Sequence, residues 1–327
     1  MNHKPMLNAY PDSLGGNLGD IVTLLKTEAM QDVFSSFYIL PSLYHSDLDR
    51  GFSVIDYDLN EQLANREDLD QLKNMGIDLK LDFILNHASA QSPQFQDLVE
   101  KGEASAYRDF FIDWNRFWEG HGTMTEEGYI QPEESCLKQM FFRKPGLPIL
   151  MVEFPDGKKV PYWNTFYQEV HGRHYLGQMD VNIQSPKVWE FYRETLEKIA
   201  SYGAAIVRLD AFAYAPKTPG KKNFLNDPET WELLQKIHGL TLLPEIHAAY
   251  DEKIYQTLAE KGYATYDFFL PGLVIDAIEN RRGTYLAAWA KEIVEKKIST
   301  VNMLGCHDGI PLLDLKGLLP KEERKAH

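Results

Sequence analysis

The sequence predicts a parallel α/β fold with one inserted subdomain. Two observations support this prediction. Short apolar runs of strand length alternate with longer amphipathic segments that have helical spacing. One long stretch, from Ala88 to Asp180, breaks this alternation with polar, aromatic and turn-forming residues.

Seven apolar runs are predicted to be strands. Most are apolar throughout, which suits a parallel sheet that is covered on both faces. In chain order they are residues 6–10, 37–43, 79–85, 205–209, 241–244, 266–270 and 300–304.

Six amphipathic segments are predicted to be helices: residues 20–30, 66–75, 186–202, 227–237, 251–260 and 285–296. Two of them carry clear end signals. The segment 66–75 stops before Gly76, and glycine is common just after a helix. The segment 186–202 starts at Ser185-Pro186, a capping residue followed by a first-turn proline.

The region 89–179 is predicted to be an inserted subdomain after the third strand, because a compact domain seldom carries so long a structureless loop. Residues 1–88 and 180–327 then form the strand–helix domain. The aromatic run 110–118 is interpreted as packing within the subdomain, in preference to a platform for sugar.

Composition excludes several classes of protein. The chain is 44% hydrophobic and 25% charged, as soluble globular proteins are, and its net charge of −14 disfavours nucleic acid or an anionic membrane surface as the main partner. Neither an apolar run of membrane-spanning length nor an apolar signal core at the N-terminus is found in the sequence. Two cysteines are too few for a disulfide framework. We therefore expect a cytoplasmic protein; its oligomeric state is not predicted.

Ionisable side chains follow four of the predicted strands. In parallel α/β barrels the strand ends face the catalytic centre. Three of these ends carry carboxylates, Asp210, Glu245 and Asp308, and histidines stand nearby at His87, His247 and His307. Asp82, inside a strand, and Asn86 are interpreted as structural hydrogen-bonding residues.

The three carboxylates match the needs of glycosyl transfer with retention. Such a reaction uses one ionised carboxylate as nucleophile and one carboxylic acid as proton donor, about 5–5.5 Å apart. Arg208 lies two residues before Asp210 on the same strand face, where its charge would keep Asp210 ionised. Glu245 would need a drier setting to stay protonated.

Several motifs resemble the signature regions of the α-amylase superfamily, in that superfamily's order. They are Asp82-Phe-Ile-Leu-Asn86-His87, Arg208-Leu-Asp210-Ala, Glu245 after a strand, and His307-Asp308. More narrowly, the chain resembles the sucrose phosphorylase group. That resemblance rests on Asp49-Arg50-Gly51-Phe52, Arg208-Leu-Asp210-Ala-Phe-Ala-Tyr214, Pro244-Glu245-Ile-His247, Tyr266-Asp267-Phe268-Phe-Leu-Pro271 and His307-Asp308-Gly309-Ile310.

The resemblance implies a TIM-type (β/α)8 barrel with an inserted subdomain after strand 3. Members of the group are longer than this chain. We therefore expect the chain to lack the last strand and helix of the barrel and the C-terminal β domain, so that seven strands are countable.

The resemblance also implies roles for individual residues. Asp210 is then the nucleophile, Glu245 the general acid and base, and Asp308 the stabiliser of the transition state. The residues implied to bind the glucosyl unit are Asp49, Phe52, His87, Arg208 and His307. Those implied to line the acceptor side are Tyr214 and His247, with Arg143 or Lys144 as candidate phosphate ligands.

The implied reaction transfers an α-glucosyl unit from sucrose, or sucrose 6′-phosphate, to inorganic phosphate through a covalent β-glucosyl ester of Asp210. A retaining α-glucoside hydrolase or transglucosidase on the same site is the first alternative. A truncated, inactive sugar-binding chain is the second.

Three other motifs are given ordinary interpretations. Cys306 beside His307 is read as packing rather than as a nucleophile. His171 and His174 stand in a glycine-containing loop without nearby cysteines, so a metal is not expected, and Gly15–Gly19 lack the spacing of a dinucleotide site. No cofactor is therefore expected.

Overall fold

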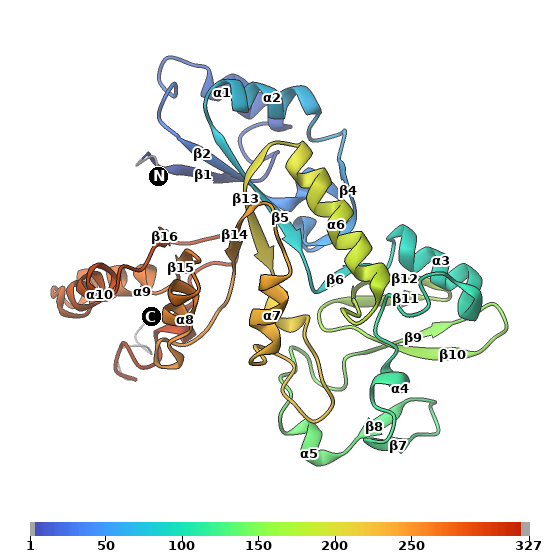
Figure 1. The fold of residues 1–327 in the computed structure, drawn as a ribbon. Helices are drawn as coiled ribbons and strands as arrows, with labels where there is room; N and C mark the ends of the chain where they lie inside the picture. Colours follow the sequence, from blue (N-terminus) through green and yellow to red (C-terminus); the bar gives the residue numbers. More distant parts are fainter. Residues whose placement is uncertain (1–3, 322–327) are drawn as a thin grey trace. The chain divides into compact units, whose positions relative to one another are not determined.

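The computed structural model describes residues 4–321. The chain divides into two compact units between Thr241 and Leu242. Each unit is described by itself (Figure 1).

A parallel sheet forms the centre of the first unit. Its strands, in spatial order, are β1 (Met6–Ala9), β2 (Ser36–Ile39), β5 (Asp78–Ile84) and β13 (Ala204–Asp210). Each neighbouring pair runs parallel, which confirms the predicted type of sheet. The sheet interior is apolar, with Phe37, Leu79 and Val207 fully buried.

Four helices alternate with these strands: α1 (Leu18–Leu25), α2 (Arg66–Asn74), α6 (Pro186–Ser201) and α7 (Glu229–Gln235). The helices α1 and α2 pack together, and α6 packs along β5 and β13 (Figure 1). A capping box at Asn65 starts α2, and Gly76 follows it with a positive φ of 74°, as its position in the sequence predicts.

Two predicted elements in the first unit end four or five residues earlier than expected. The helix expected at 20–30 is α1, which ends at Leu25 because the chain turns at Thr27, whose hydroxyl bonds to Leu24. The strand expected at 37–43 ends at Ile39, since Pro41 opens a short 3-10 turn. Ser185 precedes α6 as predicted, but its hydroxyl makes no capping bond.

An antiparallel hairpin that was not predicted follows this turn. It pairs β3 (Tyr44–Leu48) with β4 (Ser53–Leu59), and Asp49–Gly51 form its tip. Gly51 has a φ of 109°, and a Cβ there would lie 2.2 Å from the Ser42 nitrogen. Only glycine fits this crowded tip.

Short helices and hairpins build the region between β5 and α6. The strands are β6 (His87–Ser89), β7 (Gly122–Met124), β8 (Ile130–Pro132), β9 (Ile149–Glu153), β10 (Lys159–Trp163), β11 (Gln168–His171) and β12 (His174–Asp180). The helices are α3 (Pro93–Lys101), α4 (Trp114–Phe117) and α5 (Glu134–Leu137). Trp114, Trp118 and Trp163 form a buried cluster with Ile112 and Cys136, which confirms that the aromatic run packs internally.

The second unit continues the alternation of strands and helices. Its elements are β14 (Thr241–Pro244), α8 (Ile254–Glu260), β15 (Thr265–Asp267), α9 (Leu270–Glu279), α10 (Thr284–Glu295) and β16 (Thr300–Asn302). The strands β15 and β16 pair in parallel. A core of Tyr255, Phe269, Leu273, Trp289, Ile298, Leu315 and Leu319 holds the unit together.

Two predictions for the second unit need comment. The strand expected at 266–270 is only the three-residue β15, because Leu270 and Pro271 begin α9, a helix that was not predicted. The strand expected at 241–244 is β14, with the predicted bounds. Among residues 4–321, no helix combines the length and the apolar character that crossing a membrane requires.

Candidate active site

Arg208 and Asp210 lie at the end of β13 and form an ion pair. The Nη1 atom of Arg208 is 3.0 Å from Oδ1 of Asp210 and 2.6 Å from Oδ1 of Asp82 on the neighbouring strand β5. The parallel register sets Arg208 opposite Asp82. The side chain of Asp210 keeps 14% of its surface exposed, whereas Arg208 and Asp82 are buried. Asp210 is therefore the member of this group that a ligand can reach.

Asp82 has the structural role expected of it. Its second oxygen, Oδ2, accepts a hydrogen bond of 2.7 Å from the Tyr38 hydroxyl. Two buried partners thus fix the Asp82 carboxylate, which in turn fixes the guanidinium of Arg208. A buried charge of this kind is tolerated only when it is paired and hydrogen-bonded.

The backbone turns sharply after Asp210. Ala211 has a φ of 51°, a left-handed conformation that is uncommon for a residue with a Cβ. A 3-10 turn, Phe212–Tyr214, follows. Strained residues of this type cluster at functional sites, and here the strain lies directly beside the candidate nucleophile.

His87 and Phe52 contact each other in the first unit. His87 Nε2 lies 3.0 Å from the carbonyl oxygen of Phe52, and the ring of Phe52 lies 5.5 Å from Cζ of Arg208. Burial lowers the pKa of His87, so its imidazole is neutral near pH 7. Asp49 lies at the hairpin tip, where its Oδ2 accepts a 3.2 Å hydrogen bond from Gln178. These residues form one side of the candidate sugar site.

Phe166, which the sequence analysis did not single out, connects three predicted site residues. Its ring lies 4.8 Å from His87 and 5.7 Å from Tyr214. The guanidinium carbon of Arg143 lies 4.8 Å from the Phe166 ring and 5.9 Å from that of Tyr214. Arg143 is exposed, so it brings a positive charge beside Tyr214 in an otherwise acidic protein.

Lys144 lies on the same loop as Arg143. Its Nζ atom is 5.0 Å from the ring of Tyr167, and partial burial lowers its pKa. A cavity of about 60 Å³ is lined by residues of this loop, with Asn164 and Thr165 among the others. The structure thus brings Arg143 close to the candidate site, while Lys144 faces a different aromatic ring.

A buried ion pair that was not predicted lies beside His87. Lys217 Nζ is 3.0 Å from Oδ2 of Asp180 and 3.0 Å from Oδ1 of Asn86, and it also donates to the Tyr214 carbonyl. Burial lowers the pKa of Lys217, while Asp180 opposes that shift. This contact ties the end of β12 to the segment after β13.

Glu245 and His247 belong to the second unit and follow β14. His247 Nε2 is 3.3 Å from Oε1 of Glu245, and Nδ1 is 3.1 Å from Oδ2 of Asp314. Burial opposes a charge on this imidazole, but the hydrogen bonds to Asp314 and Glu245 outweigh it and raise the pKa of His247 to about 10. Glu245 is 11% exposed. Asp314, which lies beyond the last predicted strand, is a partner of His247 that was not predicted.

His307 and Asp308 follow β16. His307 Nε2 lies 3.3 Å from Oδ2 of Asp308, whose side chain is 61% exposed. Ligand atoms of Glu245, His247 and Asp308 all lie within 4.8 Å of one another, as do those of Cys306, His307 and Asp308. Spacing alone would allow a metal in either group. In the first group the charged form of His247 has no free lone pair to offer a metal.

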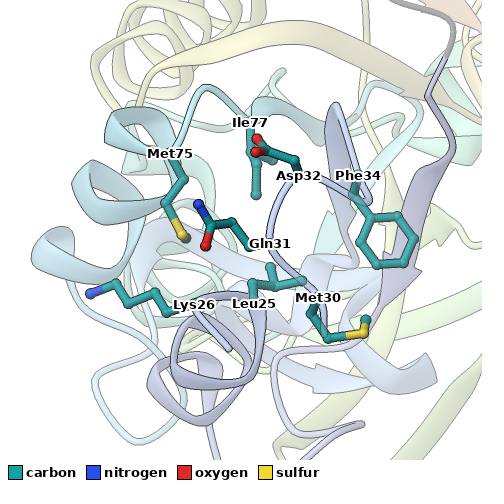
Figure 2. Close-up of a pocket in the computed structure, with 8 residues that line it drawn as sticks. All are labelled: Leu25, Lys26, Met30, Gln31, Asp32, Phe34, Met75 and Ile77. Atoms are coloured by element: carbon teal, nitrogen blue, oxygen red, sulfur yellow. The ribbon is translucent and has the colours of Figure 1, made fainter. Parts of the chain in front are cut away.

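The cavity shown in Figure 2 is not part of the candidate site, because none of the predicted site residues lines it. It has a volume of about 240 Å³ and is lined by the last residue of α1 and by the segments that follow α1 and α2: Leu25, Lys26, Met30, Gln31, Asp32, Phe34, Met75 and Ile77. Its lining is largely apolar and holds one acid and one base.

Comparisons with known proteins agree with these observations. The family model described as alpha amylase, catalytic domain, matches residues 10–270. Sucrose 6(F)-phosphate phosphorylase of Ilumatobacter coccineus is 57% identical over 325 residues, which are 96% of this chain and 62% of that protein. Sucrose phosphorylase of Streptococcus mutans is 35% identical over 329 residues, 98% of this chain and 63% of that protein.

A solved structure extends the likeness to the fold. The crystal structure of sucrose 6F-phosphate phosphorylase from Thermoanaerobacter thermosaccharolyticum matches with a TM-score of 0.88 at 32% identity, over 100% of this chain and 64% of that chain. These matches confirm the predicted barrel fold class. The chain spans just over three fifths of the length of the curated relatives it matches.

Proposed function

Since the chain belongs to the family of alpha-amylase catalytic domains, we propose that it is the catalytic portion of a retaining glycoside phosphorylase acting on sucrose 6′-phosphate or sucrose. The observation that carries the proposal is the Arg208–Asp210 ion pair at the end of β13. It supports an ionised, partly exposed carboxylate, which is what a glycosyl nucleophile requires.

The proposed reaction has two steps. Glu245 protonates the glycosidic oxygen while Asp210 attacks the anomeric carbon, so the bond to the fructosyl group breaks and a β-glucosyl ester forms. An oxygen of inorganic phosphate then attacks the anomeric carbon and the ester bond to Asp210 breaks. The product is α-glucose 1-phosphate with overall retention. Asp308 would stabilise the positive charge that develops on the sugar.

The binding roles follow the same proposal. Asp49, Phe52, His87, Arg208 and His307 would bind the glucosyl unit, and Tyr214 and His247 would line the acceptor side. The exposed positive charge of Arg143 beside Tyr214 supports an anionic group at that position, with Lys144 as a weaker candidate. We favour sucrose 6′-phosphate as the donor, because the 57% identical relative carries that name.

Two organisational proposals accompany this function. Residues 89–179 would be a subdomain inserted in the barrel formed by residues 1–88 and 180–327. The protein would work in the cytoplasm, where inorganic phosphate is available and where free thiols such as Cys136 and Cys306 stay reduced.

Product analysis tests the proposal. The purified protein is incubated with phosphate and either sucrose or sucrose 6′-phosphate, and the products are separated. Formation of α-glucose 1-phosphate supports a phosphorylase, and free glucose as the main product would instead support a hydrolase. Release of neither sugar from either donor would support a binding protein and refute the proposal.

Donor preference has its own test. Arg143→Ala should lower kcat/KM for sucrose 6′-phosphate more than for sucrose, because only the first donor carries the extra anion. Lys159→Ala, which removes a charge elsewhere in the same region, is the matched control. An equal loss for both donors would remove Arg143 from the phosphate site.

A further inference from the structure

His247 is held between two carboxylates of the second unit. Its Nε2 atom faces Glu245 at 3.3 Å and its Nδ1 atom faces Asp314 at 3.1 Å. The imidazole also stacks on Phe268, with 4.0 Å between ring centroids and 21° between planes. Phe268 in turn stacks on Tyr266. The position of the imidazole is therefore fixed on one face and at both nitrogens.

When Glu245 and Asp314 are both ionised, only the protonated ring satisfies both contacts. A neutral imidazole has one N–H group, whereas an imidazolium has two and can donate to both carboxylates. The pKa of His247, raised to about 10, agrees with this assignment. The other acid near His247 is Asp308, and Glu252 acts on Asp314 from the turn before α8. All of these neighbours are acidic and favour the imidazolium.

Core packing fixes Asp314. It lies in the 3-10 turn Leu312–Leu315, next to Leu315, which is 1% exposed within the hydrophobic core of the unit. Gly272 allows Leu315 to approach α9, because a Cβ at that position would lie 2.2 Å from Cδ1 of Leu315. Asp314 is thus positioned by a rigid neighbour.

We propose that Asp314 is a positioning residue that keeps His247 as an imidazolium against Glu245, and that this fixed charge favours transfer of the glucosyl group to phosphate over water. The inference rests on the proposed function, in which Glu245 is the general acid and base. To that function the inference adds Asp314 as a further residue, and a physical cause for the preference for phosphate over water.

The chemistry of the second step explains the effect. Water must lose a proton to Glu245 as it attacks the ester, so hydrolysis depends on Glu245 as a base. Phosphate attacks through an oxygen that is already ionised and needs little help from a base. A positive charge beside Glu245 weakens it as a base and strengthens it as an acid. The charge therefore slows hydrolysis while it assists departure of the fructosyl group in the first step.

The variant Asp314→Asn tests this arrangement. At pH 8, the ratio of glucose to α-glucose 1-phosphate should rise about five- to tenfold, the effect expected for removing one charge at this distance. The basic limb of the pH profile of kcat/KM for the donor should move to higher pH, because Glu245 then holds its proton more strongly. A purely structural defect would lower both product rates and leave the ratio and the limb unchanged.

A matched control separates charge from folding. Asp276→Asn changes another buried acid of the same unit, one that lies on α9 and accepts a hydrogen bond from the Asn280 side chain. This control should keep the wild-type ratio. Should a folded Asp314→Asn protein also keep it, with the basic limb unmoved, the inference is wrong.

NMR can follow the protonation of the His247 imidazole against pH, which tests the ion pair without an activity measurement. In the wild-type protein the ring should stay protonated to about pH 9, and in Asp314→Asn it should already be neutral at pH 8, where the product ratio is measured. A wild-type ring that titrates near 6.5 overturns the inference even if the enzyme is a phosphorylase. If the protein releases no fructosyl product, the proposed function fails while a high titration point still supports the Asp314–His247 pair.

Discussion

Nη1 of Arg208 lies 3.0 Å from Oδ1 of Asp210, and the same nitrogen lies 2.6 Å from Asp82. One guanidinium nitrogen is thus shared by a fully buried acid and a partly exposed one. Asp82 fixes the direction of the guanidinium, and the positive charge of the guanidinium also faces the partly exposed Asp210. Removing Arg208 should therefore affect stability and activity together.

We expect Arg208→Met to lower the free energy of unfolding by about 3–5 kcal/mol, because Asp82 would be left as an uncompensated buried charge. Urea unfolding followed by circular dichroism measures this loss. The double variant Arg208→Met/Asp82→Asn should regain part of it, since no charge is then buried. A single variant within about 0.5 kcal/mol of wild type, the range of ordinary surface changes, would contradict this view of the pair.

Two conservative variants, at Asp210 and Glu245, distinguish the proposed nucleophile from the proposed general acid. Asp210→Asn should lose at least about 1,000-fold in kcat with every donor. Glu245→Gln should lose about 100- to 10,000-fold with sucrose but keep most of its initial burst with α-glucosyl fluoride, because fluoride leaves without being protonated. Initial rates and released fluoride measure both effects. Equal losses with the two donors would deny Glu245 the role of acid.

The buried cation Lys217 should matter for stability. Lys217→Met would remove the positive partner of Asp180, which is fully buried, at a cost of about 3 kcal/mol. The control Lys221→Met breaks an exposed pair with Glu229 and should cost less than about 1 kcal/mol. Thermal unfolding of the two variants side by side provides the comparison, and similar losses would refute the prediction.

Gly272 should resist substitution, because a methyl group there would overlap Leu315. Gly272→Ala is expected to destabilise the protein by about 1–3 kcal/mol through overpacking. Gly283→Ala places the same methyl group in open space just before α10 and should change stability by about 0.5 kcal/mol or less. Calorimetry of both variants is the measurement. A tolerated alanine at 272 would mean that Leu315 moves easily.

The stabilising contribution of His247 should depend on pH. Its pKa is raised from 6.5 to about 10 on folding, so the folded state binds the proton more tightly. The contribution is therefore fully present below pH 6.5 and is lost as the pH rises through about 10. The difference in unfolding free energy between wild type and His247→Gln, measured from pH 6 to pH 10, should shrink over this range. A constant or growing difference would contradict the pairing.

Local signals in the sequence predicted the regular elements well. Thr241–Pro244 is a strand with the predicted bounds, and α2 starts at Arg66 as predicted, after its capping residue Asn65. Both depend on neighbours in the chain. The start of α9 was missed because the apolar run 266–270 fits a strand and a helix equally well, and only the bond from the Leu270 nitrogen to Asp267 shows where the helix begins.

Only part of the candidate site could be predicted, because local sequence signals do not show contacts that tertiary packing makes. The Arg208–Asp210 pair could be foreseen because a two-residue spacing on a strand puts both side chains on one face. Phe166, Lys217 and Asp314 could not, because each lies in a turn or loop and reaches its partner through tertiary packing. Phe166 meets Tyr214 and Asp314 meets His247 across 48 and 67 residues of chain, respectively.

Asp314 and Leu315 are adjacent in the chain, so one turn links the core of the second unit to the charge on His247. Leu315 belongs to the hydrophobic interior, and Asp314, as we propose, sets the charge beside Glu245, so a looser interior would change the chemistry of the site. Mild heating, or several neutral substitutions around Leu315, would then raise the ratio of hydrolysis to phosphorolysis while the protein is still folded. Increased hydrolysis of the glucosyl ester would then be the first measurable sign that the core of the second unit has loosened.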